Sequence, residues 1–135
     1  MCSSDLLERV LVSHDAGAGR AGDVLEIASG TGQHVAYFAA RLPGLTFQPS
    51  DPDAANRASI AAWVAEAGVE NVRAPIALDV TVQPWPVTRP VAAILCINMI
   101  HIAPWEATLG LMQGAARLLA PGAPLTLYEI GRAHV

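Results

Sequence analysis

Apolar residues recur along this chain in two alternating patterns, short runs and rows at helical spacing. The short runs are typical of buried strands and are expected at residues 24–28, 45–48, 72–80, 91–97 and 124–128. The rows, with apolar positions three and four residues apart, predict helices at about residues 7–14, 35–42, 54–67 and 104–119. Because strand and helix alternate about five times, the pattern favours an α/β fold with a parallel sheet covered by helices.

Several residues refine these elements. The continuous apolar run Val91–Ile97 is typical of a central strand that is buried on both faces. Asp53 is the expected N-cap of the helix that follows it. Pro75 has no backbone N–H and weakens the first half of the predicted strand around it. In the last predicted helix, the spacing places these residues on the inward face: Leu109, Met112, Ala116 and Leu119.

The composition narrows the possible functions. The 135 residues are 53% hydrophobic and 15% charged, which fits one globular domain rather than a disordered chain. All eight basic residues are arginines, so mechanisms that need a lysine amine or a phosphate-loop lysine are excluded. The net charge is −4 and the arginines are scattered, which disfavours nucleic acid as a partner.

The expected location follows from the apolar stretches and the cysteines. Val91–Ile97 is far shorter than the roughly 18 residues of a membrane span, and the N-terminus lacks the layout of a signal peptide. We therefore expect a cytoplasmic protein with no membrane partner. Of the cysteines, Cys2 and Cys96, the second lies in an apolar run as a small buried hydrophobe, so neither a disulfide nor a metal site is expected. The oligomeric state stays open.

Both ends of the chain look foreign to the domain. Residues 1–6 and 129–135 can be encoded by the two orientations of one oligonucleotide, which resembles a common sequencing adapter. We therefore expect a domain of residues 7–128, incomplete at its C-terminus, with non-native ends on either side.

Chemistry-bearing residues follow three of the predicted strands, where ligands of parallel sheets bind. The turn from Ser29 to Gly32 opens a helix, and its glycines let the backbone pass close to a ligand. Asp51 ends the second strand, where a carboxylate can accept hydrogen bonds from the ribose hydroxyls of an adenosine. Asp79 ends the third strand and could accept from an adenine amino group. Each of these features has an alternative interpretation. The glycine turn could be a strand-to-helix connection without a ligand, Asp51 a turn or cap residue beside Pro52, and Asp79 an ordinary strand-end turn.

The same positions discriminate between cofactors. Val35 stands where the dinucleotide fingerprint needs a third glycine, so the loop fits a nicotinamide cofactor poorly. Several acids and no phosphate-binding cation suit a cofactor that carries an adenosine and a positive charge but no phosphate.

Three strings of the sequence carry a resemblance to a known class: VLEIASGTGQH, FQPSDPD and INMIHIAPW. They resemble the class I S-adenosylmethionine-dependent methyltransferases and, more closely, a methyltransferase-like family of unknown function. The resemblance covers most of residues 7–128. It implies a Rossmann-like, doubly wound, mostly parallel sheet, S-adenosyl-L-methionine as the cofactor and methyl transfer as the activity. It also implies two further strands after Tyr128, which this sequence lacks.

The resemblance also implies roles for individual residues. Asp51 would hold the ribose, Asp79 with Val80 would bracket the adenine, and Asn98 to His101 would face the methyl group. Ala28 stands where many members of the class have glycine, which crowds the loop slightly. The residues that would line the methionine portion of the cofactor are Glu26, Ala28, Ser29, Gly30, Thr31 and Gly32.

Methyl transfer from a sulfonium is an in-line displacement, which mainly requires that the reactants be held in position. His101 is the candidate general base, or it bonds the backbone and fixes its loop, and Asn98 could orient the acceptor. Gln33 and His34 could reach the cofactor or cap the helix. The segment after the fourth strand lacks the Asn/Asp-Pro-Pro-aromatic string associated with nucleobase amino groups, so a small-molecule acceptor is expected.

Two other functions stay open at this point. One is a non-catalytic module that binds S-adenosylmethionine in a regulatory or scaffold role. The other is a nicotinamide-dependent oxidoreductase, which Val35 disfavours.

Overall fold

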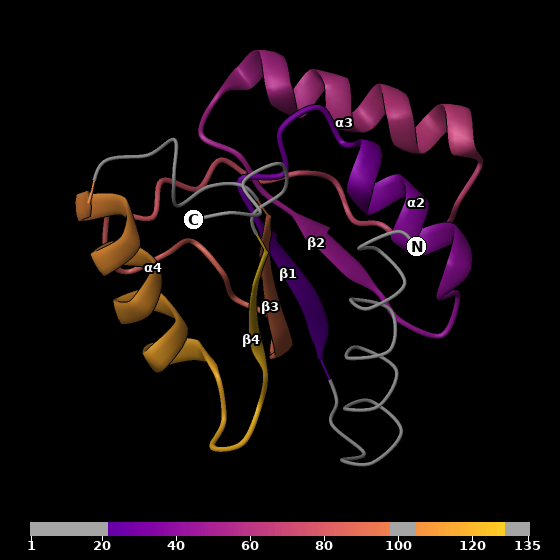
Figure 1. Ribbon diagram of the computed structural model, residues 1–135. Coiled ribbons are helices and arrows are strands. Elements are labelled where there is room, and N and C mark those ends of the chain that lie inside the picture. The colour runs from indigo at the N-terminus through magenta and orange to yellow at the C-terminus, as the bar shows by residue number, and fades with distance from the viewer. Residues whose placement is uncertain (1–21, 98–104, 129–135) are drawn as a thin grey trace, which may run out of the picture.

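The computed structural model describes residues 22–97 and 105–128 of the chain. Four parallel strands form one sheet in the order β2-β1-β3-β4 (Figure 1). This is the Rossmann-like α/β arrangement that the sequence predicts. The predicted helix at 7–14 lies outside the described residues, as does the segment 98–104. The strands are β1 (Asp23–Ile27), β2 (Phe47–Pro49), β3 (Val91–Ile97) and β4 (Leu125–Tyr128).

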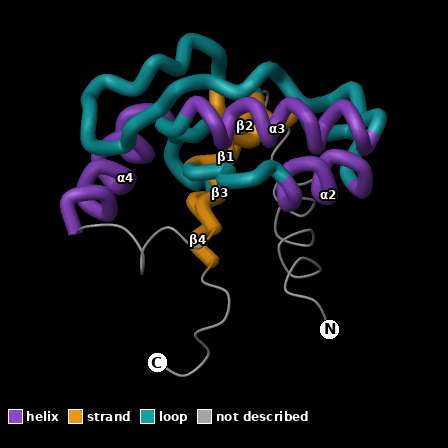
Figure 2. Tube along the Cα trace, turned by 90° about the horizontal axis from the view of Figure 1, so that it is seen from above, coloured by secondary structure: helices purple, strands orange, loops and turns teal. Residues whose placement is uncertain are grey.

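In the described part of the chain, three helices cover the two faces of the sheet. They are α2 (Gln33–Arg41), α3 (Ala54–Ala67) and α4 (Trp105–Leu118). The predicted bounds of α3 are confirmed, and Asp53 caps it by accepting a hydrogen bond from Ala55 N at 2.8 Å. Seen from above, the strands stand in a row with α4 and α2 on opposite sides (Figure 2). None of the described helices is long and apolar enough to cross a membrane.

The core is divided by the sheet into two clusters. On the side of α2 and α3, Phe38 and Ile60 pack with Phe47 and Leu95 of the strands. On the side of α4, Leu111 packs against residues such as Ile27, Ile94 and the ring of Trp85. β3 contributes to both clusters, so its prediction as a central strand that is buried on both faces is confirmed. Cys96 is buried in β3, as predicted.

The strand predicted at residues 72–80 is wrong as a regular strand. The segment runs beside β2 with only two isolated parallel bridges, Phe47 to Val72 and Ser50 to Ile76. Pro75 lies between these bridges and has no N–H to donate, which explains why no continuous ladder forms.

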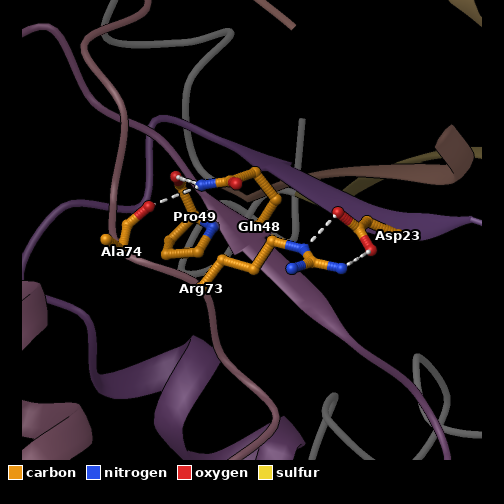
Figure 3. A network of polar contacts seen from close by, with 5 residues as sticks. All are labelled: Asp23, Gln48, Pro49, Arg73 and Ala74. Carbon is orange, nitrogen blue, oxygen red and sulfur yellow. Dashed lines mark hydrogen bonds and ion pairs between the residues drawn. The ribbon is translucent and has the colours of Figure 1, made fainter. Parts of the chain in front are cut away.

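Side chains replace the missing ladder bonds of this segment (Figure 3). Gln48 donates through Nε2 to the carbonyl oxygens of Pro49 and Ala74, both at 2.9 Å. Arg73 forms an ion pair with the buried Asp23 of β1, with Nε 2.7 Å from Oδ2. The segment is therefore held in parallel to β2, and its last residues, including Asp79, still reach the carboxyl edge of the sheet.

The inward face predicted for α4 is also wrong. Leu109 and Met112 are 47% and 42% exposed, and Ala116 is exposed as well. Only Leu119, just after the helix, packs partly buried against the cluster on the α4 side. The residues that face the sheet side are mostly small: Ala107, Thr108, Gly110, Leu111, Gly114 and Ala115.

Close packing explains this choice of face. A Cβ at Gly110 would overlap the carbonyl group of Val80, and a Cβ at Gly114 would overlap the Trp85 ring. The side of α4 that carries Gly110 and Gly114 therefore packs closely against the loop that contains Val80 and Trp85. A prediction based on large apolar residues misses a helix face that packs through glycine and alanine.

Candidate functional site

The ends of β1 and β2 are joined by a buried polar cluster. Ser50 donates through its hydroxyl to the carbonyl oxygen of Glu26 at 2.7 Å, and its backbone N–H donates to Ser29 Oγ at 3.1 Å. The N–H of Ser29 donates to the carbonyl oxygen of Ser50 at 2.8 Å. These bonds fix the turn after β1 against the end of β2, so the Gly-rich turn and Asp51 are held next to each other.

The turn after β1 uses left-handed backbone conformations at three positions. Ala28, Gly30 and Gly32 have φ values of 55°, 62° and 97°. Ala28 shows that this conformation by itself does not exclude a side chain here, although it costs about 1–2 kcal/mol in a non-glycine residue.

The two glycines of the turn differ in what surrounds them. A Cβ on Gly32 would lie 2.6 Å from the Cα of Ile60, so Gly32 is required where α2 and α3 meet. Among the described residues, apart from its chain neighbours, nothing lies within 4 Å of a Cβ built on Gly30. Packing of this part of the chain therefore does not explain the glycine at position 30, and the space that it leaves next to the Cα of Gly30 is open to a ligand.

The carboxylate of Asp51 is buried, with 5% of the residue exposed. Its Oδ2 accepts a hydrogen bond from Gly30 N at 3.0 Å. Its Oδ1 accepts from Asp53 N at 3.0 Å and from the amide Nδ2 of Asn56 at 3.1 Å. Asp51 thus joins the Gly-rich turn, its own loop and α3.

Glu26 lies on β1 just before the turn and is 2% exposed. The pKa of its carboxyl is raised to about 8: burial raises it most, a hydrogen bond with Ser29 lowers it in part, and the nearby charge of Asp51 raises it. Its Oε1 has no hydrogen-bond partner among the described residues. A buried acid with an unpaired oxygen, next to an open turn, suits a site that receives a positive charge.

Asp79 lies at the same edge but is exposed. Its Oδ1 accepts from the N–H of Thr81 at 2.9 Å and from the Thr81 hydroxyl at 2.6 Å. These bonds lower the pKa of the Asp79 carboxyl, the side-chain bond most. Asp79 therefore forms the strand-end turn that was its alternative interpretation, and Oδ2 is the oxygen that would be left to contact an adenine.

The neighbour of Asp79, Val80, is buried and fixed through its carbonyl oxygen. That oxygen accepts from Gln83 Nε2 at 3.0 Å and from Trp85 Nε1 at 3.2 Å. Gln83 also donates to the carbonyl oxygen of Gly110 at 3.1 Å. The loop that carries Asp79 is thus attached to α4, and Trp85 anchors the loop.

The first turn of α2 completes the described part of the site. Gln33 is exposed and His34 is half-buried, and burial lowers the pKa of the His34 imidazole. Thr31 accepts a hydrogen bond at its carbonyl oxygen from Ser59 Oγ of α3 at 2.8 Å. Neither Gln33 nor His34 caps the helix through a side-chain hydrogen bond, since Gly32 is the N-cap and has none.

Asn98 and His101, the candidate catalytic residues, lie outside the described residues, so their roles stay predictions. Ser50, Asn56 and Gln83 hold the site together and were not predicted. Ser50 and Asn56 stand one residue before and five residues after Asp51, which is the only local signal that could have pointed to them. Within the described ranges, no cluster of His, Cys, Asp and Glu could hold a metal ion.

The fold agrees with solved structures of methyltransferases. TrmN from Thermus thermophilus matches with a TM-score of 0.71 at 20% identity, over 94% of this chain and 38% of that one. SAM-bound CalS10, an amino pentose methyltransferase from Micromonospora echinaspora, matches with a TM-score of 0.67 at 24% identity, over 91% and 49%. PKMT2 from Rickettsia typhi in complex with AdoHcy matches with a TM-score of 0.64 at 20% identity, over 76% and 19%.

These likenesses define the fold as that of the class I S-adenosylmethionine-dependent methyltransferases, in part. This chain spans less than half of the length of each of the three structures. Residues 4–131 match the model of a family described as "Protein of unknown function (DUF938)", and the chain belongs to that family.

Proposed function

We propose that this chain binds S-adenosylmethionine at the carboxyl edge of its sheet, and that the protein transfers the methyl group to a small-molecule acceptor. The observation that carries the proposal is the open space at Gly30, in a turn that follows the buried Glu26 and is bonded to the buried Asp51. Gly30 donates to Asp51, and apart from its chain neighbours no described residue lies within 4 Å of where its Cβ would be. The unpaired oxygen of Glu26 lies on β1, just before the same turn.

The residues present fit this cofactor on chemical grounds. S-adenosylmethionine carries a sulfonium, an ammonium and a ribose diol but no phosphate, and the site offers carboxylates and no lysine. A dinucleotide would bring two phosphates next to the carboxylate of Asp51 and would hold Glu26 in its protonated form, so repulsion from Asp51 disfavours binding. SAM-bound CalS10 and the AdoHcy complex of PKMT2 support the same choice by their likeness in fold.

Each residue would have a distinct task in binding. Asp51 would accept from a ribose hydroxyl through Oδ2, which has one of its two acceptor positions taken. Glu26, which its raised pKa of about 8 keeps protonated near neutral pH, would release its proton and supply a negative charge once the positively charged methionine part lies beside it. Asp79 would accept from the adenine amino group. Gly30 would leave room for the cofactor, and the α2 N-terminus would offer unpaired N–H groups to its carboxylate.

When bound, the cofactor supplies an activated methyl group for in-line displacement. The task of this protein is then to hold an acceptor in line and to take up its proton where the acceptor has one. His101 would act as that base and Asn98 would orient the acceptor, in keeping with their positions directly after β3. The net charge of −4 supports a small-molecule acceptor over nucleic acid.

A glycine pair in the chain allows a matched test of the binding site. Gly30 and Gly68 both have left-handed backbones, with φ of 62° and 68°, and both have open space where a Cβ would be. Gly68 ends α3, away from the turn. We expect Gly30→Val to abolish a thermal shift with S-adenosylmethionine, whereas Gly68→Val, at a similar cost in stability, keeps it. Equal loss or equal retention in the two variants would refute the site.

Transfer needs a second experiment, because binding and turnover are separate claims. The protein is incubated with S-adenosylmethionine labelled in its methyl group and with a metabolite extract, and label in a small-molecule fraction is the expected result. Binding without any transfer would favour the non-catalytic module over the enzyme.

A further inference from the structure

The acceptor capacity of Asp51 limits what it can do for a ligand. A carboxylate offers about four acceptor positions, two on each oxygen. Oδ1 already accepts from Asp53 N and Asn56 Nδ2, and Oδ2 accepts from Gly30 N. About one position is left, on Oδ2. The carboxylate by itself therefore cannot accept from both hydroxyls of a ribose unless one of these three bonds breaks.

Two of the three bonds are part of the backbone framework. The N–H groups of Gly30 and Asp53 are fixed by the turn and by the loop that caps α3. Arg57 holds the same loop from the helix, donating through Nη1 to the carbonyl oxygen of Asp51 at 2.9 Å. The third donor, the amide of Asn56, is a side chain and is the one that ligand binding can use or displace.

Asn56 has hydrogen-bonding capacity to spare. It is half-buried, in the first turn of α3, with one of its two amide N–H groups donated to Asp51. Its Oδ1 is an acceptor for which the described residues show no hydrogen bond, next to the carboxylate oxygen that is already full. A ligand hydroxyl that has no free acceptor position on Asp51 Oδ1 can form its hydrogen bond with the Asn56 amide instead.

We propose that Asn56 is a specificity residue that reads one hydroxyl of the ribose, while Asp51 reads the other. This inference rests on the proposed function, since it takes an adenosyl ligand at this edge of the sheet as its starting point. The pair Asp51 and Asn56 then selects a vicinal diol, and a ligand that lacks either hydroxyl leaves one member of the pair without its partner.

The test compares S-adenosylmethionine with its 2′-deoxy and 3′-deoxy forms by calorimetry. We expect the wild-type protein to bind each deoxy form about 3- to 10-fold more weakly, which is the usual effect of one lost hydrogen bond. Asn56→Leu keeps the approximate volume of the side chain, removes its polar atoms and shields Oδ1 of Asp51. In this variant one of the two deoxy forms should bind as well as S-adenosylmethionine does, while the other deoxy form should still bind more weakly. Asn56→Met is the second variant, in case the leucine does not fold.

Ser59→Ala is the matched control, because it removes a bond from α3 to the Gly-rich turn without touching Asp51. It should leave both deoxy penalties unchanged. If Asn56→Leu weakens all three ligands by the same factor, Asn56 only supports Asp51 and the inference is wrong. The wild-type protein could instead bind adenosine, bind both deoxy forms of adenosine more weakly, and not bind S-adenosylmethionine. That result would support the reading of the ribose diol by Asp51 and Asn56 and would refute the proposed function. If neither ligand binds, both fail.

Discussion

Replacing Glu26 by glutamine should change how the stability of this protein depends on pH. Burial raises the pKa of Glu26 from its ordinary 4.5 to about 8. Between these two values the folded protein keeps a proton that the unfolded chain has released. The stability contribution of this group is therefore fully present below about pH 4.5 and is lost as pH rises towards 8.

The size of the effect follows from the same window. Each pH unit inside it costs the folded state about 1.4 kcal/mol, so the whole window is worth on the order of 5 kcal/mol. Glutamine has nearly the same shape and does not titrate. The difference in free energy of unfolding between Glu26→Gln and wild type should therefore shift in favour of the variant by about 3 kcal/mol from pH 5.5 to pH 7.5.

Urea denaturation followed by circular dichroism at the two pH values measures this difference. Glu66→Gln removes a carboxylate of similar type from an exposed position of α3 and is the matched control. Its free-energy difference from wild type should change far less between the two pH values. A difference for Glu26→Gln that stays constant within about 0.5 kcal/mol would show that the pKa of Glu26 is not raised in the folded protein, and the account of Glu26 as a buried, protonated carboxyl would be wrong.

Two further predictions concern glycines at close contacts. Gly32→Ala places a Cβ 2.6 Å from the Cα of Ile60 in a left-handed turn, and we expect a loss of about 2–4 kcal/mol in unfolding free energy by urea titration, larger than for Gly30→Ala. An equal loss at both positions would contradict the account of the turn. The Cβ of Gly114→Ala would push against the ring of Trp85, so we expect a loss of about 1–3 kcal/mol in unfolding free energy and a changed tryptophan fluorescence. If neither quantity changes, α4 does not pack against Trp85 in this way.

The fold could be predicted wherever a pattern of large apolar residues decides the structure. The runs at 24–28 and 91–97 and the helix at 54–67 formed close to their predicted bounds because their apolar residues meet in the core. The strand at 72–80 could not be judged from its apolar residues, since the missing N–H of Pro75 outweighed them. The face of α4 was missed because glycine and alanine, rather than leucine, make the close contact with the Trp85 loop.

The candidate site divides in a similar way. The Gly-rich turn and Asp51 were predictable because they follow apolar runs directly and the ends of parallel strands meet at one edge. The residues that hold them were not, because their partners are distant in sequence: Ser50 bonds Glu26 across 24 residues, and Gln83 bonds Gly110 across 27. Asn56 carries no motif, and only the filled Oδ1 of the Asp51 carboxylate gives it a role.

The most direct test of the central claim is a calorimetric titration of the wild-type protein with S-adenosylmethionine and, in parallel, with NAD. We expect saturable binding of one S-adenosylmethionine per chain and no heat of binding from NAD. Asp51→Ala should weaken the binding of S-adenosylmethionine by about 1.5–3 kcal/mol, because a charge-assisted hydrogen bond is lost. Saturable binding of NAD, with none of S-adenosylmethionine, would show that the proposed cofactor is wrong.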